Sequence, residues 1–131
     1  MAAPVLMFGV GAAKSGTSWL YRYLAEHPEC HLRSIKELHF FDGRGQGERD
    51  WHLRQLTRKS DALERQIASS NGEAPLGQIV HLAEMRLYAR VLGEGRTSGY
   101  MAFLMDGRDE ERVVGDITPS YALLSEATLR E

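Results

Sequence analysis

The sequence predicts an α/β fold in which a parallel sheet is flanked by helices. The apolar run Pro4 to Val10 is typical of a short buried strand, and a glycine-rich loop and a helical pattern from Thr17 follow it. A second apolar pair, Val113-Val114, leads toward Thr118-Pro119, which is typical of a helix start. Strand, loop, helix, insertion, strand and helix is the order in which parallel sheets are built.

The composition is that of an ordinary globular protein and argues against two classes of partner. Of the 131 residues, 43% are hydrophobic and 26% are charged, which is enough apolar content for a packed core. The formal net charge of −2 argues against a nucleic-acid-binding surface, and no segment is long enough to span a membrane. The single cysteine, Cys30, excludes an internal disulfide. We therefore expect a soluble, cytoplasmic chain without nucleic-acid or membrane partners.

The first helix is expected to begin at Thr17 and to end before Pro28. A residue that precedes proline is pushed out of the helical region, so His27 should terminate the helix. The spacing of the apolar residues places one stripe on a single helix face. That stripe comprises Trp19, Leu20, Tyr23 and Leu24, and we expect Trp19 to lie in the core.

Between the two predicted strands, the pattern indicates a compact segment and three helices. The compact segment runs from Ile35 to Asp42, and the glycines from Gly43 onward end it. The helices are expected from Trp51 to about Ser69 after an Asp50 cap, from Leu76 to Leu92 before Gly93 and Gly95, and from Tyr100 to Met105. The residues expected to face inward are Leu56, Leu63 and Ile67 in the first helix, and Val80, Ala83, Leu87 and Val91 in the second. A last helix should run from Thr118 to Glu131.

The glycine-rich loop predicts an anion site. Gly11 to Ser18 reads G-A-A-K-S-G-T-S, and a loop of this kind between a strand and a helix directs several backbone N–H groups to one point. A Walker A loop needs lysine where this chain has Thr17, whereas the lysine of this loop, Lys14, lies three residues earlier. This P-loop-type arrangement suits a donor with one phosphate and one sulfate better than magnesium-ATP. The alternative is that the glycines form only a tight structural turn.

Three motifs in order resemble one enzyme family. Lys14 to Trp19 resembles the 5′-phosphosulfate loop, commonly P-K-S-G-T-T-W, of sulfotransferases that use 3′-phosphoadenosine-5′-phosphosulfate (PAPS), with Ala13 in place of the proline. Leu24 to Pro28 followed by Lys36 to Asp42 resembles the L-x-x-H-P and K-E-x-H-F-F-D pattern of the carbohydrate branch, especially the heparan-sulfate sulfotransferases. Gly115 to Tyr121 resembles that branch's G-E-K-[ST]-P-x-Y segment.

The resemblance implies a cofactor, an acceptor class and a set of site residues. The cofactor is PAPS, and the acceptor is a hydroxyl or amine of a carbohydrate or small molecule. Glu37 matches the general base that deprotonates the acceptor, and His39 would orient Glu37 or the acceptor, since the two share a face if the segment is extended. Lys14 would stabilise the charge that grows on the leaving phosphate. The residues that would hold the cofactor are Lys14, Ser15, Gly16, Thr17 and Ser18.

Each of these assignments has a structural alternative. Glu37 could form only a surface ion pair with Lys36, and His39 could be a structural histidine. Asp42 could bind the acceptor, although a turn role is favoured. Asp116 could contact acceptor or loop, cap the turn at Thr118, or bind magnesium in a nucleotide kinase.

Two further observations bear on the chemistry. The residue that matches a lysine of the branch is Ile117, so one positive charge is absent from this segment. His27, Cys30 and His31 invite a metal site, but no fourth ligand has suitable spacing, and we expect no metal ion there.

We expect residues 1–131 to be the N-terminal part of a single domain. Residues 5–34 would form the phosphosulfate-loop unit, 35–42 the catalytic segment, 43–112 a helical acceptor-side insertion, and 113–131 a strand and helix. The family's contacts to the 3′-phosphate and adenine follow later, so we expect this chain alone to bind PAPS weakly and to turn over slowly or not at all. A non-catalytic binding module is the remaining alternative.

Overall fold

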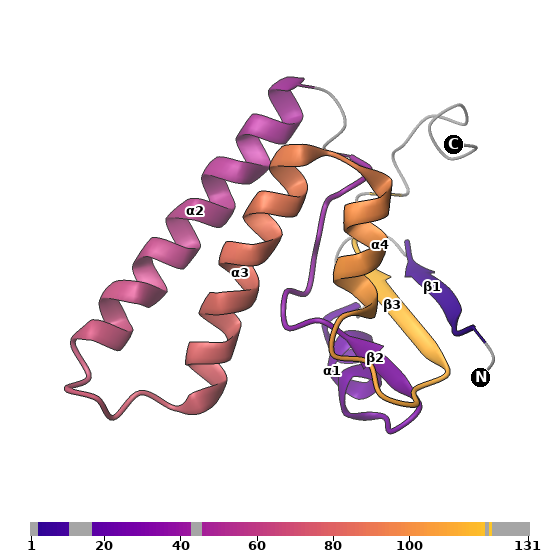
Figure 1. Cartoon of the computed structure of the whole chain (residues 1–131), viewed down its shortest axis with the longest axis horizontal. Helices are drawn as coiled ribbons and strands as arrows, with labels where there is room; N and C mark the ends of the chain where they lie inside the picture. Colours follow the sequence, from indigo (N-terminus) through magenta and orange to yellow (C-terminus); the bar gives the residue numbers. More distant parts are fainter. Residues whose placement is uncertain (1–2, 11–16, 43–45, 120, 122–131) are drawn as a thin grey trace.

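The computed structural model describes residues 3–10, 17–42, 46–119 and 121. Within them, a three-stranded parallel sheet is flanked by four helices, which confirms the predicted α/β fold (Figure 1). In chain order the elements are β1 (Val5–Gly9), α1 (Thr17–Glu26), β2 (Cys30–Leu32), α2 (Gln46–Ala68), α3 (Leu76–Glu94), α4 (Thr97–Met105) and β3 (Val113–Ile117). None of the described helices is both long and apolar enough to cross a bilayer.

The central strand, β3, joins the beginning of the chain to its later part. The strand order is β1-β3-β2, and both pairs of neighbours are parallel. The register pairs Gly9 with Ile117, so β1 and β3 end at the same edge of the sheet. Past that edge, the backbone N–H of Thr118 donates to the carbonyl oxygen of Gly9 at 3.0 Å. Gly9, which precedes the glycine loop, is thereby hydrogen-bonded to Thr118, which follows β3.

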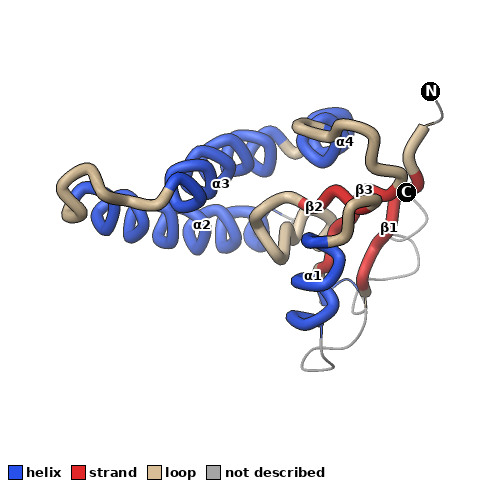
Figure 2. Tube along the Cα trace, turned by 90° about the horizontal axis from the view of Figure 1, so that it is seen from below, coloured by secondary structure: helices blue, strands red, loops and turns tan. Residues whose placement is uncertain are grey.

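The helices lie on both faces of the sheet and beside it. Figure 2 shows α4 on one face and α1 on the other. Helices α2 and α3 form a hairpin that extends away from the sheet (Figure 1). The turn between them contains Asn71 at φ 55° and Gly72 at φ 82°, a left-handed backbone that asparagine and glycine adopt most readily. Gly95, at φ 69°, caps α3 and donates its N–H to the carbonyl oxygen of Val91.

The core lies between α3, α4, β3 and the loop that follows β2. From this loop, Leu38 and Phe40 are both only 3% exposed. The Phe40 ring stacks on Tyr100 of α4, with a centroid distance of 4.4 Å. The hydroxyl of Tyr88 on α3 donates to the carbonyl oxygen of Leu38 at 2.7 Å. A segment without regular secondary structure is therefore part of the core.

The predicted start of α2 and the predicted inner face of α3 are wrong. Helix α2 begins at Gln46, so Asp50 lies inside the helix rather than at its cap. On α3, Val80 and Leu87 are 47% and 39% exposed. The buried residues of α3 are Met85, Tyr88 and Leu92. Apolar residues surround this helix, so periodicity alone could not select the face, which is set by packing on α4 and the Leu38 segment.

The expected burial of the first two elements is also wrong. Trp19 is 70% exposed and stacks on Tyr23, which is 54% exposed, with ring centroids 5.6 Å apart. Val5 in β1 is 65% exposed, and β1 pairs with another strand along one side only within the described sheet. The apolar face of α1 therefore lies at the surface of the described residues.

The helix expected after Thr118 falls almost wholly outside the described residues. The described part of it shows a turn, in which the N–H of Tyr121 donates to the carbonyl oxygen of Thr118 at 3.0 Å. Residues 120 and 122–131 are not described.

Replacing Gly9 by alanine should destabilise the fold, because the added Cβ would lie 2.9 Å from Cγ1 of Ile117. Ile117 is fully buried and β-branched, so it has little freedom to move away. We expect Gly9→Ala to lower the free energy of unfolding by about 1–3 kcal/mol, as overpacking usually does, in urea denaturation.

Gly77→Ala is the matched control. A Cβ at Gly77, inside α3, meets no atom within 4 Å, and alanine favours a helix by roughly 1 kcal/mol over glycine. This variant should be neutral or more stable. Equal destabilisation by both substitutions would contradict the close approach at Gly9.

Candidate active site

The loop between β2 and α2 is attached to the carboxyl end of β3. The backbone N–H of Leu38 donates to the Thr118 hydroxyl oxygen at 3.0 Å, and the N–H of Phe40 donates to the Tyr121 hydroxyl oxygen at 2.9 Å. Thr118 also donates its own N–H to Gly9. These bonds place the segment around Glu37 and His39 at the sheet edge where β1 ends. In parallel sheets, this is the edge at which ligands bind.

A buried carboxylate organises the residues that hold this loop. Asp116 is 1% exposed and accepts hydrogen bonds from the hydroxyl groups of Tyr100, Thr118 and Tyr121. Burial raises the pKa of the Asp116 carboxyl above its ordinary value, and the three hydroxyl donors partly oppose that shift. Burial and the nearby Asp116 charge also raise the pKa of the Tyr100 and Tyr121 hydroxyls. Both tyrosines therefore remain protonated donors at neutral pH.

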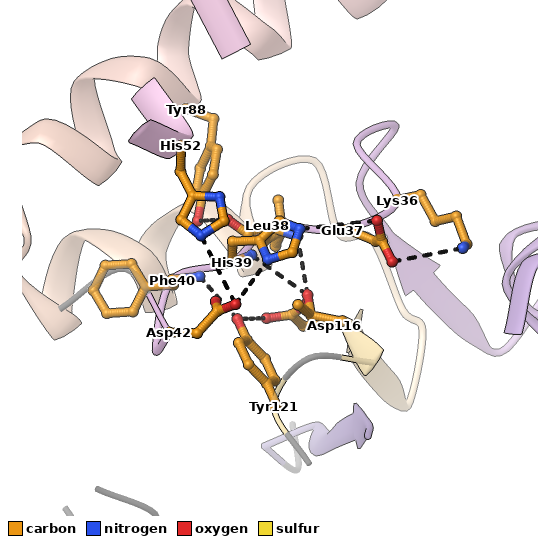
Figure 3. A network of polar contacts seen from close by, with 11 residues as sticks. Lys36, Glu37, Leu38, His39, Phe40, Asp42, His52, Tyr88, Asp116 and Tyr121 are labelled. Carbon is orange, nitrogen blue, oxygen red and sulfur yellow. Dashed lines mark hydrogen bonds and ion pairs between the residues drawn. The ribbon is translucent and has the colours of Figure 1, made fainter. Parts of the chain in front are cut away.

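Glu37, His39 and Asp42 form a row of polar side chains (Figure 3). His39 Nδ1 lies 2.9 Å from Asp42 Oδ2, and His39 Nε2 lies 3.8 Å from Glu37 Oε2. An ionised carboxylate can only accept, so His39 donates its Nδ1 proton to Asp42 and turns Nε2 toward Glu37. Lys36 lies on the other side, with its Nζ 3.9 Å from Glu37 Oε1. Glu37 thus lies near both His39, which was expected to orient it, and Lys36, which was expected to form a surface ion pair with it.

The backbone of this row differs from the extended strand that the sequence analysis considered. His39 has φ 54°, in the left-handed region, which is uncommon for a residue other than glycine. Glu37 and His39 are nevertheless close, because the turn at His39 rather than strand alternation brings their side chains together. Strained backbone of this kind is often found at functional sites.

His52 is a neighbour of this row that the sequence analysis missed. It lies on α2, and its ring stacks on that of His39 with centroids 4.3 Å apart and planes 15° apart. Its Nε2 lies 3.8 Å from Asp42 Oδ2. Burial, followed by the charge of His39, lowers the pKa of His52 against the opposing effect of Asp42 and Glu48. The ring is therefore neutral near pH 7.

A pocket opens beside the row, between the Ser34–His39 segment and the hairpin of α2 and α3. Its volume is about 530 Å³. Apolar side chains of α2 and α3, among them Leu56, Met85 and Leu92, line one part of it, and Trp51 stands at the edge with 52% exposure. The lysine, glutamate and histidine residues that line it are Lys36, Glu37, His39, His52, Lys59 and His81. A pocket of this size and mixed chemistry suits one small molecule or sugar unit.

The structure describes only part of the expected cofactor loop. Lys14, Ser15 and Gly16 lie outside the described residues. Thr17 begins α1, and Ser18 is exposed in its first turn. The loop therefore runs from the carboxyl end of β1 to the amino end of α1, as the motif requires.

The structure also describes the surroundings of Asp116, Ile117 and the His27–His31 segment. Asp116 is buried and bonded to three hydroxyls, which favours its structural role and leaves no access for magnesium. Ile117 is fully buried. His31 Nε2 lies 2.8 Å from the carbonyl oxygen of Asp106, and His27 Nδ1 accepts the N–H of Glu29, so each ring has one nitrogen in a contact to backbone.

The match to a protein-family model decides the identification. The model described as the sulfotransferase family matches residues 4–130. The chain belongs to the sulfotransferase family. Among curated proteins and among solved structures, no match was found. In this member of the family, Glu37 is a carboxylate at the pocket with 41% side-chain exposure.

The raised pKa of Asp116 predicts a pH-dependent contribution to the stability of this sulfotransferase. Between the ordinary aspartate pKa of about 3.9 and the raised folded-state value, the folded chain binds more protons than the unfolded chain. The free energy of unfolding contributed by Asp116 therefore falls as pH rises through that window. Asp116→Asn removes this titration, so the difference in unfolding free energy, wild type minus variant, should decrease from pH 4 upward in urea titrations.

Asp109→Asn, which alters an exposed aspartate, is the control and should preserve the wild-type profile. A difference between wild type and Asp116→Asn that rises with pH would show that Asp116 is charge-stabilised instead.

Proposed function

We propose that this sulfotransferase transfers the sulfuryl group of PAPS to a hydroxyl or amine of a carbohydrate or small-molecule acceptor held in the 530 Å³ pocket. One observation carries the proposal. The segment that presents Glu37 is bonded through Thr118 to Gly9, the last residue of β1. The candidate base and the beginning of the glycine loop thus share one edge of the sheet.

In this proposal the glycine loop holds the donor. Backbone N–H groups and hydroxyls of residues 15–18 bind the 5′-phosphate, helped by the positive end of the α1 dipole. Lys14 contacts the bridging oxygen between phosphate and sulfate. There it stabilises the charge that develops as the S–O bond breaks.

The acceptor reacts at Glu37. As the acceptor oxygen or nitrogen forms its bond to sulfur, its proton passes to the Glu37 carboxylate, and 3′-phosphoadenosine-5′-phosphate (PAP) leaves with the electron pair of the broken S–O bond. His39, held by Asp42, keeps a ring nitrogen 3.8 Å from Glu37 and positions that carboxylate. Lys36 Nζ lies 3.9 Å from Glu37 Oε1, on the side of the carboxylate away from His39.

The carbohydrate branch is the proposed source of the acceptor class. The K-E-x-H-F-F-D pattern supports it, and in the structure Trp51 offers a flat apolar surface at the pocket edge of the kind on which sugar rings pack. Two lysines, Lys36 and Lys59, line the same pocket. They favour an acceptor that already carries a negative group.

The nucleotide-kinase alternative loses its main support, because Asp116 is enclosed by three hydroxyl donors. The alternative that the experiments below test is a binding module without catalytic activity.

Substitution of the candidate base should stop transfer without preventing donor binding. We expect Glu37→Gln to lower kcat by roughly 10²–10⁴-fold, the usual contribution of a general base, with little change in PAP affinity. The measurement is PAP release from PAPS with a panel of amino sugars and phenols as acceptors. Glu64→Gln is the matched control, because Glu64 forms an exposed pair with Arg86 on the hairpin. Unchanged turnover in Glu37→Gln would remove Glu37 from the mechanism.

Donor binding should appear as a thermal shift that depends on Lys14. PAP at 100 times its Kd should stabilise the fold by about 2.7 kcal/mol, and Lys14→Ala should abolish the shift of the unfolding midpoint. Lys59→Ala, on α2, is the control and should retain it. A shift only with magnesium-ATP would support a kinase, and no shift with either ligand would support a non-catalytic module.

A further inference from the structure

Three metal-ligating side chains converge at the rim of the pocket. One donor atom from each of His39, Asp42 and His52 lies within 4.8 Å of the other two (Figure 3). Two of these residues belong to the loop before α2, and the third comes from α2 itself. We propose that His39, Asp42 and His52 bind a divalent transition-metal ion of the Zn²⁺ type. This site shares His39 and Asp42 with the proposed transfer site, but its test measures metal binding alone and does not depend on the donor or the acceptor.

The distances suit a small tetrahedral ion. Zinc binds imidazole nitrogen and carboxylate oxygen at roughly 2.0–2.2 Å, so neighbouring ligand atoms lie about 3.3 Å apart in a tetrahedron. Asp42 Oδ2 lies 2.9 Å from His39 Nδ1 and 3.8 Å from His52 Nε2, which brackets that value. The two rings are now 15° from parallel, so they must rotate for their lone pairs to converge. The broad terminal torsion of histidine permits such rotation.

The surroundings supply charge balance and a rigid frame. Asp42 and the neighbouring Glu37 together carry the two negative charges that a divalent cation requires, and Glu37 lies 3.8 Å from His39. Hydrogen bonds from the backbone of Leu38 and Phe40 to Thr118 and Tyr121 fix the loop on both sides of His39. A site whose ligands are already held in place loses less entropy on binding.

The three ligands and their exposure indicate which metal ion binds and that one coordination position stays available. Two imidazoles and a carboxylate favour Zn²⁺ and similar ions over Mg²⁺ or Ca²⁺, which prefer oxygen ligands alone. The side chains of His39, Asp42 and His52 are 25%, 15% and 14% exposed, and both histidines line the pocket. Three protein ligands leave a fourth position for water or for a pocket ligand. On binding, the metal takes the place of the proton on His39 Nδ1, and that proton moves to Nε2, which faces Glu37, so the ligating imidazole stays neutral.

Cobalt(II) is the probe for this site, because its visible absorption reports tetrahedral coordination. Titration of the whole chain with Co²⁺ should produce visible bands without a thiolate charge-transfer band, and Zn²⁺ should displace them. Loss of an outer-shell partner alone weakens metal binding by roughly 10–100-fold, so loss of a ligand in His52→Gln should weaken it by about 100-fold or more. His81→Gln is the control, since His81 lines the same pocket but contacts Ser34 instead.

Three results would overturn the proposal: no visible bands, equal Co²⁺ affinity in wild type and His52→Gln, or a thiolate band that disappears in Cys30→Ser. The last would place the metal at His27, Cys30 and His31. Circular dichroism and the thermal midpoint without metal establish that each variant is folded. If His52→Gln is unfolded, His39→Gln takes its place, with the same expected loss of affinity.

Discussion

The buried Asp116 carboxylate is the interaction on which the rest of the structure depends. A carboxylate without solvent must be satisfied by donors, and here all three are hydroxyls, from Tyr100 on α4, from Thr118 and from Tyr121. Two of these hydroxyls also act as acceptors. The Thr118 hydroxyl accepts a hydrogen bond from the backbone N–H of Leu38, and the Tyr121 hydroxyl accepts one from the N–H of Phe40. A single charge therefore joins α4, the end of β3 and the loop that carries the candidate base. Removing the hydroxyl of Thr118 or Tyr121 would take one donor from Asp116 and one acceptor from a backbone N–H of the loop.

The same attachment explains how an irregular loop presents polar side chains with precision. Leu38 and Phe40 are buried in the core, each 3% exposed. Glu37, which precedes them, and His39, which lies between them, line the pocket. The left-handed backbone at His39 costs free energy, and the burial of its two neighbours offsets that cost. The active-site geometry is in this sense a consequence of core packing, which is why it does not need a regular strand.

Local signals in the sequence predicted the order of elements well, and long-range pairing was beyond them. Proline and glycine marked the ends of α1, α2 and α3, because these residues act through their own backbone. The motif around Glu37 and His39 also placed the two side chains together. By contrast, the apolar residues of α3 surround the helix, so its buried face could not be chosen. The contact of His52 with His39 depends on how α2 packs against the loop that precedes it. The spacing of residues in the sequence does not predict this packing.

The pocket is lined by residues from two separate parts of the fold, the sheet edge and the hairpin of α2 and α3. The residues proposed to act on the reacting atoms belong to the sheet edge, whereas Trp51, Gln55 and Lys59 of the pocket belong to α2. Helix α2 is held mainly by α3, through contacts such as the 3.0 Å bond from Arg86 to the buried Ser60. Substitutions on the pocket face of α2 can therefore reshape the pocket while the Asp116 network stays intact. Because His52 is the α2 residue that stacks on His39, it is the point at which a change in the hairpin reaches the chemistry.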